Sequence, residues 1–266
     1  MAAGMDLELD GRVVLIVGAS GGIGAATARR LAASGARLAL LARNRGRLAT
    51  LAASLGTHAD ALVLNTDAAQ PSALDDAVAQ TLAHFGRLDR LVVTAGPMGR
   101  RASFHLLGDD DWDAYYERSL MISVRACRAA LPALLENGDG ALVLTAACSI
   151  RAQKPDLGAY SAMKNAVASV AKNIALTYGA QGLRANCIAP GVIVRDVAPP
   201  GSPGEAARAH DVHARYEAVR AATGMQVALG RAGRHEEFAD AIAFLLSNRA
   251  SYITGATINI DGGTNF

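Results

Sequence analysis

The stretch "VLIVGASGGIGAATARRLA", residues 14–32, joins an apolar strand pattern to an amphipathic helix pattern through a run of glycines. Glycines allow the backbone to turn tightly and to approach a pyrophosphate closely. The N–H groups and the dipole of the following helix then meet the negative charge of the phosphates. We therefore expect a nucleotide-binding turn here, which comprises Gly18, Ser20, Gly21, Gly22, Ile23 and Gly24.

The alternation of strand and helix patterns continues outward from this turn. Residues 22–35 and 75–86 each have an apolar face and end in glycine, as helices often do. Apolar runs typical of buried parallel strands stand at residues 12–18, 36–42, 60–65, 90–96, 141–147, 184–190 and 256–261. The sequence predicts an α/β fold: a doubly wound parallel sheet of about seven strands, helices on both faces, in one domain over residues 1–266.

One long irregular stretch interrupts the pattern. Residues 195–216 are rich in Pro and Gly, and long loops in compact domains are usually functional, so we expect a substrate lid at about 195–225. His210 and His213 lie in this lid at a spacing that can suit a metal. Because no further ligand accompanies them, a solvated helix face is favoured and no metal is expected.

Composition excludes several classes of protein. The chain has 266 residues, of which 51% are hydrophobic and 19% are charged, so it can bury a sizeable core. A formal net charge of +2 without a basic block argues against a nucleic-acid partner. The acidic start and the lack of an apolar run near ~20 residues predict a soluble, cytoplasmic protein without a membrane partner. Cys127, Cys148 and Cys187 are widely spaced, which predicts buried free thiols.

The motifs occur in a recognisable order: the glycine turn, Asp67, "TAG" at 94–96, Tyr160 with Lys164, Pro190-Gly191, and "DGG" at 261–263. Over essentially the whole chain this order resembles the classical short-chain dehydrogenase/reductase family, which has a Rossmann-type fold. The resemblance implies that Asp67 lies near adenine, that Gly96 backs the adenosine ribose, and that Ile193 contacts the nicotinamide carboxamide. Beyond the glycine turn, the implied cofactor site comprises Arg43, Asp67, Ala68, Ala95, Gly96, Tyr160, Lys164, Pro190, Gly191 and Ile193.

The choice between NADH and NADPH is read at the end of the second predicted strand. An acidic residue there would accept hydrogen bonds from a free ribose 2′-hydroxyl. Ala42 and Arg43 stand at this point instead, with Asn44 and Arg45 beside them. Because a guanidinium pairs well with a phosphate, we expect NADP(H) as the cofactor; a solvated loop arginine is the alternative.

Tyr160 and Lys164 are four residues apart, so they share one face of a helix. An ammonium there can hold the cofactor ribose and lower the pKa of the phenol from its ordinary value of ~10. Tyr160 is therefore the predicted general acid, supported by Lys164.

The remaining catalytic positions depart from the family pattern. The resemblance implies a carbonyl-binding serine thirteen residues before the tyrosine, where Ala147 stands, and a helical asparagine, where Ser119 stands. Ser149, two residues beyond Ala147, is a candidate replacement hydroxyl, although a loop serine bonded to the backbone is an equal interpretation. Thr94 and Arg195 also replace residues that are usual in the family.

Three hypotheses follow. The first is an NADPH-dependent reductase of a ketone or 3-oxoacyl-type small molecule. The second is reduction of an activated C=C bond, such as an enone or enoyl thioester, which would dispense with the serine missing at Ala147. The third is a non-catalytic nucleotide-binding protein. The resemblance also implies a homotetramer or homodimer, because the C-terminal strand and long helices pack between subunits in the family.

Overall fold

The computed structural model describes residues 6–56, 59–96, 98–194 and 211–264. Within these residues seven strands form one parallel sheet in the order β3-β2-β1-β4-β5-β6-β7. The strands are β1 Val13–Val17, β2 Arg37–Ala42, β3 Ala61–Asn65, β4 Arg90–Val93, β5 Ala141–Thr145, β6 Arg184–Pro190 and β7 Thr257–Ile260. The predicted Rossmann-type doubly wound sheet is confirmed.

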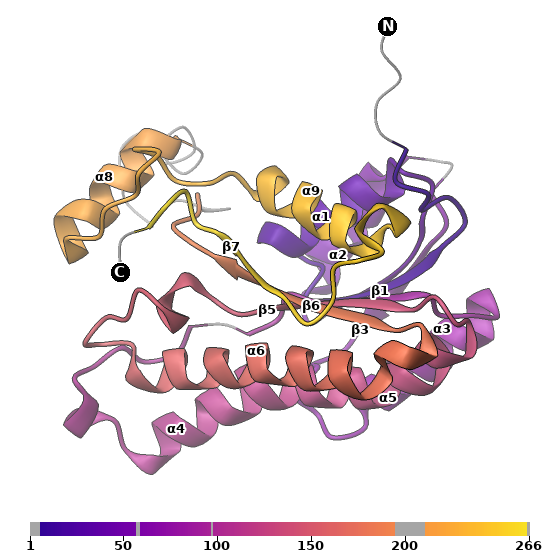
Figure 1. The fold of residues 1–266 in the computed structure, drawn as a ribbon, viewed down its shortest axis with the longest axis horizontal. Coiled ribbons are helices and arrows are strands. Elements are labelled where there is room, and N and C mark those ends of the chain that lie inside the picture. Colours follow the sequence, from indigo (N-terminus) through magenta and orange to yellow (C-terminus); the bar gives the residue numbers. More distant parts are fainter. Residues whose placement is uncertain (1–5, 57–58, 97, 195–210, 265–266) are drawn as a thin grey trace, which may run out of the picture.

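Helices cover both faces of this sheet (Figure 1). On one face lie α1 Gly22–Ala32, α2 Arg45–Ser54 and α9 His235–Leu246. On the other lie α3 Ala73–Phe85, α5 Ile122–Glu136 and α6 Gly158–Tyr178. Leu15 of β1 belongs to the core beneath α3 and α5, whereas Val14 and Ile16 belong to the core beneath α1 and α9. Burial on both faces explains why this strand reads as a continuous apolar run.

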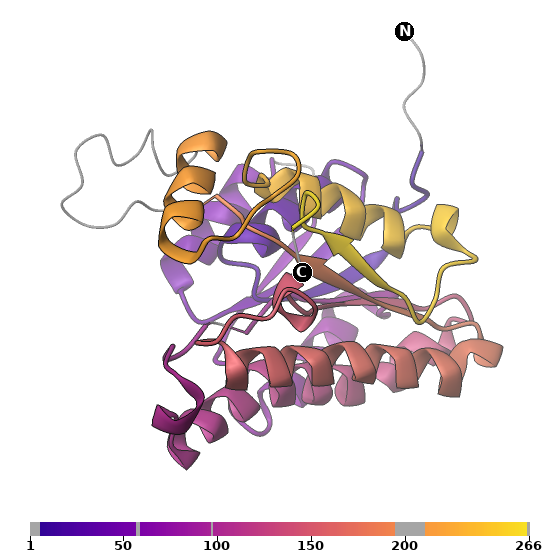
Figure 2. The ribbon, with the colours of Figure 1, turned by 60° about the vertical axis from the view of Figure 1, so that its left-hand side comes forward.

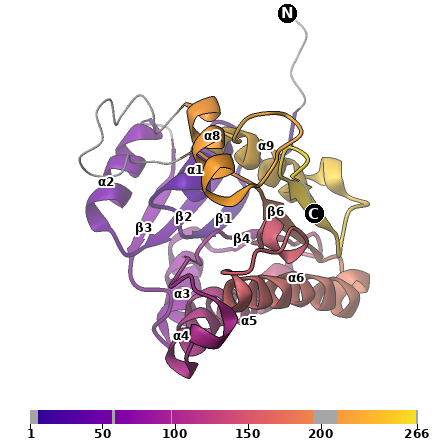
Figure 3. The same ribbon diagram turned by 90° about the vertical axis from the view of Figure 1, so that its left-hand side faces the viewer.

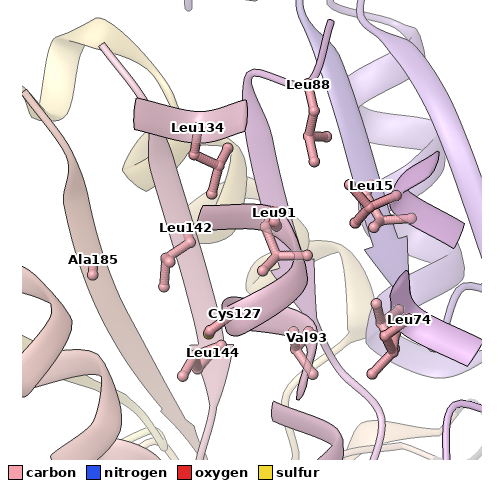
Figure 4. Close-up of a cluster of buried hydrophobic side chains, with 14 of the residues drawn as sticks. Leu15, Leu74, Leu88, Leu91, Val93, Cys127, Leu134, Leu142, Leu144 and Ala185 are labelled. Atoms are coloured by element: carbon pink, nitrogen blue, oxygen red, sulfur yellow. The ribbon is translucent and has the colours of Figure 1, made fainter. Parts of the chain in front are cut away.

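Figure 4 shows the core on the α3 and α5 face, where Leu91 and Leu142 of neighbouring strands lie near Leu134 and Cys127 of α5. Burial raises the pKa of the Cys127 thiol to about 12, and it does the same for Cys187 of β6. Both are therefore buried free thiols, as predicted.

Two further helices, α4 and α8, lie at one end of the molecule. Figures 2 and 3 show α4 and α8 at this end, on opposite sides of the sheet. α4 is Asp109–Tyr115 and α8 is Val212–Thr223, and a π-helical turn, η2, covers Tyr116–Met121 between α4 and α5. The 3₁₀ turns are η1 Phe104–Leu106, η3 Cys148–Ile150, η4 Gly179–Gln181 and η5 Asn248–Ala250.

The opposite end of the sheet is held by two arginines, one buried and one half-buried. Arg90, at the amino end of β4, is completely buried and donates to the carbonyls of Leu246 (2.8 Å) and Asp139 (2.7 Å). Arg184, at the amino end of β6, donates to the carbonyls of Leu245 (2.7 Å) and Ser247 (2.9 Å). The bonds to Leu245, Leu246 and Ser247 satisfy carbonyls at the end of α9, which intrahelical hydrogen bonds leave without donors.

The strand order places a crevice at the carboxyl ends of β1 and β4. The chain runs from β1 to β2 and β3 on one side, and then returns to β4 on the other side of β1. In doubly wound sheets ligands bind where the strand order reverses in this way. In the described part of the chain, no helix is both long and apolar enough to cross a membrane.

Candidate active site

The glycine turn follows β1 and opens α1. A Cβ atom built on Gly18 would lie 2.7 Å from the backbone nitrogen of Ala95, and one built on Gly24 would overlap the carbonyl oxygen of Gly18. Side chains are therefore excluded at both positions. Gly21, the residue before α1, has an extended backbone, and as a glycine it has no side chain that could cap the helix. The turn thus forms the narrow backbone cradle, at a helix N-terminus, that a pyrophosphate requires.

Beside this turn lies a cleft of about 650 Å³. We call it the adenine cleft, and the predicted residues among its lining are Gly18, Ser20, Ala42, Arg43, Asp67, Ala68, Ala95 and Gly96. The structure therefore brings together residues that follow four different strands. Gly21 and Gly22 line a smaller groove on the outer side of the turn.

The loop after β2 presents Arg43 to the adenine cleft. Its backbone is held by Asn65, whose side-chain amide donates to the carbonyls of Ala42 (3.1 Å) and Arg43 (2.9 Å). Asn44 caps α2 by accepting from the backbone N–H of Arg47 at 2.9 Å. This cap begins the helix so that Arg47 also lines the cleft.

Two of the cations that line the adenine cleft were not predicted from the sequence. Arg45 was expected beside Arg43, but Arg47 lines the cleft instead, because the helical turn that begins at Asn44 sets its direction. Arg118, from the η2 turn, also lines the cleft and lies 3.9 Å from the carboxylate of Asp67. Its position in the chain carried no signal, since only the fold brings η2 beside the loop after β3.

A larger cavity of about 980 Å³ adjoins the adenine cleft, and both are lined by Thr94 and Gly96. We call it the reaction cavity. The predicted residues among its lining are Ile23, Gly96, Ala147, Ser149, Tyr160, Lys164, Pro190, Gly191 and Ile193. A dinucleotide that crosses the sheet edge at Gly96 would therefore place its two ends in the two cavities.

Lys164 is buried beneath the reaction cavity, on α6. Its Nζ donates to the carbonyl of Thr145 at 2.9 Å, and a Cβ atom built on Gly96 would lie only 2.8 Å from it. Burial lowers the pKa of Lys164 to about 8. The glycine at position 96 thus leaves room for the ammonium at the wall between the two cavities.

Tyr160 lies one helical turn before Lys164, whose Nζ is 5.7 Å from the centre of the phenol ring. The Tyr115 ring packs edge-on against it, with 6.0 Å between the ring centres. Burial raises the pKa of Tyr160 to about 12. The expectation that Lys164 lowers this pKa is therefore wrong, because desolvation of the phenol raises it and no opposing effect of Lys164 is found.

The loop after β5 contributes Ala147, Cys148 and Ser149 to the lining of the reaction cavity. Ala147 places a methyl group where the family resemblance implies a hydroxyl. The Ser149 Oγ is buried and has no hydrogen-bond partner within the described residues. Cys148 is only partly buried, so it is the one cysteine that departs from the prediction of a buried thiol.

Ser119 occupies the π-helical turn η2 and is completely buried. Its Oγ has no partner within the described residues, and it lies 3.6 Å from a Cβ atom built on Gly96. The predicted catalytic positions 119 and 164 therefore flank the same glycine. π-helical turns are frequent at functional sites.

Part of the segment predicted to be a lid lines the reaction cavity. α8 contributes Ala214, Ala218 and Val219 to its wall, while residues 195–210, including Arg195 and His210, lie outside the described residues. Arg215 also lines the cavity and donates to the carbonyl of Ile193 at 3.1 Å. His213 lies 3.3 Å from the carbonyl of Gly230. Within the described residues, no three His, Cys, Asp or Glu side chains are placed to share a metal.

Comparison with known proteins decides the family. Residues 18–265 match the family model described as "Enoyl-(Acyl carrier protein) reductase", which represents short-chain dehydrogenases/reductases. The chain belongs to the short-chain dehydrogenase/reductase family. Among curated members, D-threitol dehydrogenase of Mycolicibacterium smegmatis is 35% identical over 99% of this chain and 96% of its own length.

Solved structures of this family agree. A short-chain dehydrogenase/reductase from Serratia marcescens is 30% identical and superposes with a TM-score of 0.81, covering 96% of this chain and 98% of its own. The 3-ketoacyl-(acyl-carrier-protein) reductase of Brucella melitensis, complexed with NADH, is 26% identical with a TM-score of 0.82, and it covers 96% and 99% of the two chains. The resemblance inferred from the motifs is thus confirmed over nearly the whole chain.

Proposed function

We propose that this chain is an NADPH-dependent reductase of a ketone or 3-oxoacyl-type small molecule. The observation that carries the proposal is the convergence of Tyr160 and Lys164 on one cavity, which adjoins a nucleotide cradle at Gly96. D-threitol dehydrogenase and 3-ketoacyl-(acyl-carrier-protein) reductase, both similar to this chain, are named for chemistry at an alcohol or ketone carbon, which supports it.

The cavity residues divide the work of the proposed reaction. A bound nicotinamide supplies the hydride. Tyr160 donates a proton to the carbonyl oxygen, and its raised pKa of about 12 keeps the phenol protonated at neutral pH, as reduction requires. Lys164 is anchored by the Thr145 carbonyl and directs its remaining donors to a ribose beside Gly96. Apolar residues such as Ala147 and Leu157 line the cavity around these groups.

The adenine cleft supports NADPH as the cofactor. Arg43, Arg47 and Arg118 line it, and Asp67 is the one carboxylate among its described lining residues. Arg118 already lies near Asp67, at 3.9 Å. Arg43 and Arg47 are thus the cations proposed to pair with a 2′-phosphate, next to the small Ala42.

A specific observation favours a second candidate function, reduction of an activated C=C bond. Ala147 provides no hydroxyl, and the Oγ of Ser149, the candidate replacement, is buried without a hydrogen-bond partner among the described residues. The description of the matching family model, an enoyl reductase, agrees with this chemistry. In such a reaction, Tyr160 alone would meet the developing enolate oxygen.

Product analysis tests both candidates. The purified protein is incubated with NADPH and a panel of ketones and enones, and products are identified by mass spectrometry and NMR. Alcohols from ketones support the first function, whereas saturated ketones from enones support the second. Tight NADPH binding without turnover of either class would instead indicate the non-catalytic nucleotide-binding protein.

We also propose a homotetramer or homodimer in the cytoplasm. The edge strand β7 has four half-exposed residues, and Leu176 on α6 is 74% exposed. Light scattering at micromolar concentration should give a mass of two or four chains. A stable monomer would contradict this proposal.

A further inference from the structure

The reaction cavity combines apolar walls with an excess of positive charge. Arg101, Lys154 and Arg215 line it together with the buried Lys164, and no carboxylate is among its described lining residues. Ligand pockets usually hold few polar groups, and those present fix the orientation of the ligand. The cationic side chains at this cavity therefore indicate what kind of ligand it binds.

Within the described part of the chain, Lys154 differs from the other cations of this cavity in having no side-chain partner. Arg101 pairs with Asp156 at 2.6 Å. Asp156 is the acidic residue nearest to Lys154 in the sequence, and it is therefore already paired with another cation. Arg215 is bonded to the Ile193 carbonyl. Lys154 is half-buried and makes no hydrogen bond or ion pair through its ammonium with the described residues.

The charge of Lys154 affects the pKa of a thiol that lines the same cavity as the proposed acid. It acts on the Cys148 thiol, lowering its pKa against a larger rise from burial, and Cys148 in turn acts on Tyr160. Asp261 also acts on Cys148, but it does not line the cavity. Lys154, Cys148 and Tyr160 thus all line the reaction cavity.

We propose that the substrate is an oxo acid whose carboxylate pairs with Lys154 while its ketone meets Tyr160. Its apolar body would lie along Ala147 and Leu157, which line the cavity with these residues. This inference rests on the proposed reductase function, and it names Lys154 as a specificity-determining residue. A partly desolvated ammonium gains a charge-assisted hydrogen bond only when the ligand brings the anion.

Turnover of matched acids and amides tests the proposal. NADPH oxidation is measured with 3-oxobutanoate, 5-oxohexanoate and 7-oxooctanoate and with their primary amides, because the amide removes only the charge. For the acid of matching length, the acid-over-amide ratio of kcat/KM should fall about tenfold in Lys154→Met, as expected for loss of one charged hydrogen bond. Lys154→Arg should retain most of the preference.

Arg151→Met is the matched control. Arg151 lies in the same loop and is exposed, but it does not line the cavity. The acid-over-amide ratio should be the same in this variant as in the original protein. An equal ratio in the original protein and in Lys154→Met, at every chain length, would overturn the proposal while leaving ketone reduction standing.

A binding measurement separates failure of this proposal from failure of the proposed function. Calorimetry on the protein saturated with NADP⁺ compares octanoate with octanamide, which needs no turnover. The octanoate-over-octanamide preference should fall about tenfold in Lys154→Met and persist in Lys154→Arg. If no ketone is reduced but this loss appears, the anion site stands and the reaction is wrong; if octanoate is not preferred, the anion site is wrong.

Discussion

The adenine cleft and the reaction cavity meet at Thr94 and Gly96, yet they are built differently. At the adenine end the backbone restricts which residues can stand at positions 18 and 24, because a side chain at Gly18 or Gly24 would collide with neighbouring main chain. At the reaction end the side chains define the site, and Ala147 and Ser119 stand where the family resemblance implies a serine and an asparagine. Cofactor binding is thus tied to the fold, whereas the reacting groups can change independently of it.

Removing the proton donor should produce the largest effect. Tyr160→Phe should lower kcat by roughly 10²–10⁴, the contribution of general acid catalysis, with NADPH affinity nearly unchanged. Steady-state kinetics and fluorescence titration measure the two quantities. Tyr115→Phe is the control, since Tyr115 packs against Tyr160 but its hydroxyl donates to the Arg100 carbonyl. If Tyr160→Phe turns over a confirmed substrate at the original rate, another residue is the acid.

A hydroxyl restored at position 147, where the family resemblance implies a serine, should change the chemistry at the reaction end without changing the adenine end. Ala147→Ser should raise kcat/KM for ketone reduction by up to ~10²-fold, because a preorganised donor to the carbonyl oxygen contributes about that much. Ala146→Ser, one residue earlier on the same wall, should give no gain. A gain would identify an impaired ketone reductase. No gain, or a loss, would favour the enone reaction in a pocket reshaped for it.

Changing the adenine cleft should alter cofactor choice and leave the chemistry intact. Ala42→Asp combined with Arg43→Leu should shift the ratio of NADPH to NADH affinity by about 10–100-fold towards NADH, as expected for a lost charged hydrogen bond. Arg45→Leu should leave the ratio unchanged, since Arg45 does not line the cleft. Dissociation constants by fluorescence titration measure the shift. Tighter NADH than NADPH binding in the original protein would refute the assignment.

The buried ammonium of Lys164 should lower the free energy of unfolding at neutral pH. Its pKa is about 8 when folded, against an ordinary value of 10.5. Between these two pKa values the unfolded chain binds more protons than the folded chain does. The free energy of unfolding therefore rises with pH from about 8 to 10.5. Below pH 8 the buried charge destabilises the folded state to its full extent. Lys164→Met should therefore stabilise the protein at pH 7 by about 1–3 kcal/mol.

Urea unfolding of Lys164→Met and the original protein at several pH values measures this effect. The difference should shrink as pH rises through 8 to 10.5. Lys172→Met, an exposed position on the same helix, provides the control. A difference that does not vary with pH would show that packing, and not the buried charge, sets the effect.

The sequence by itself determined the elements whose signals are local. Strands buried on both faces, such as Val13–Val17, read as continuous apolar runs, and the glycine turn after β1 is a contiguous motif. The residues predicted at the ends of strands, including Arg43 and Asp67, also lie in the adenine cleft, because parallel strands end at one edge of the sheet.

Only the tertiary structure decided what depends on distant segments. The raised pKa of Tyr160 comes from burial beside Tyr115, which is 45 residues away in the chain. Arg118 reaches the cleft through the π-helical turn, and among the described residues Arg101 pairs with Asp156 while Lys154 has no ion-pair partner. Desolvation and charge pairing depend on three-dimensional distance, and linear spacing carries no record of it.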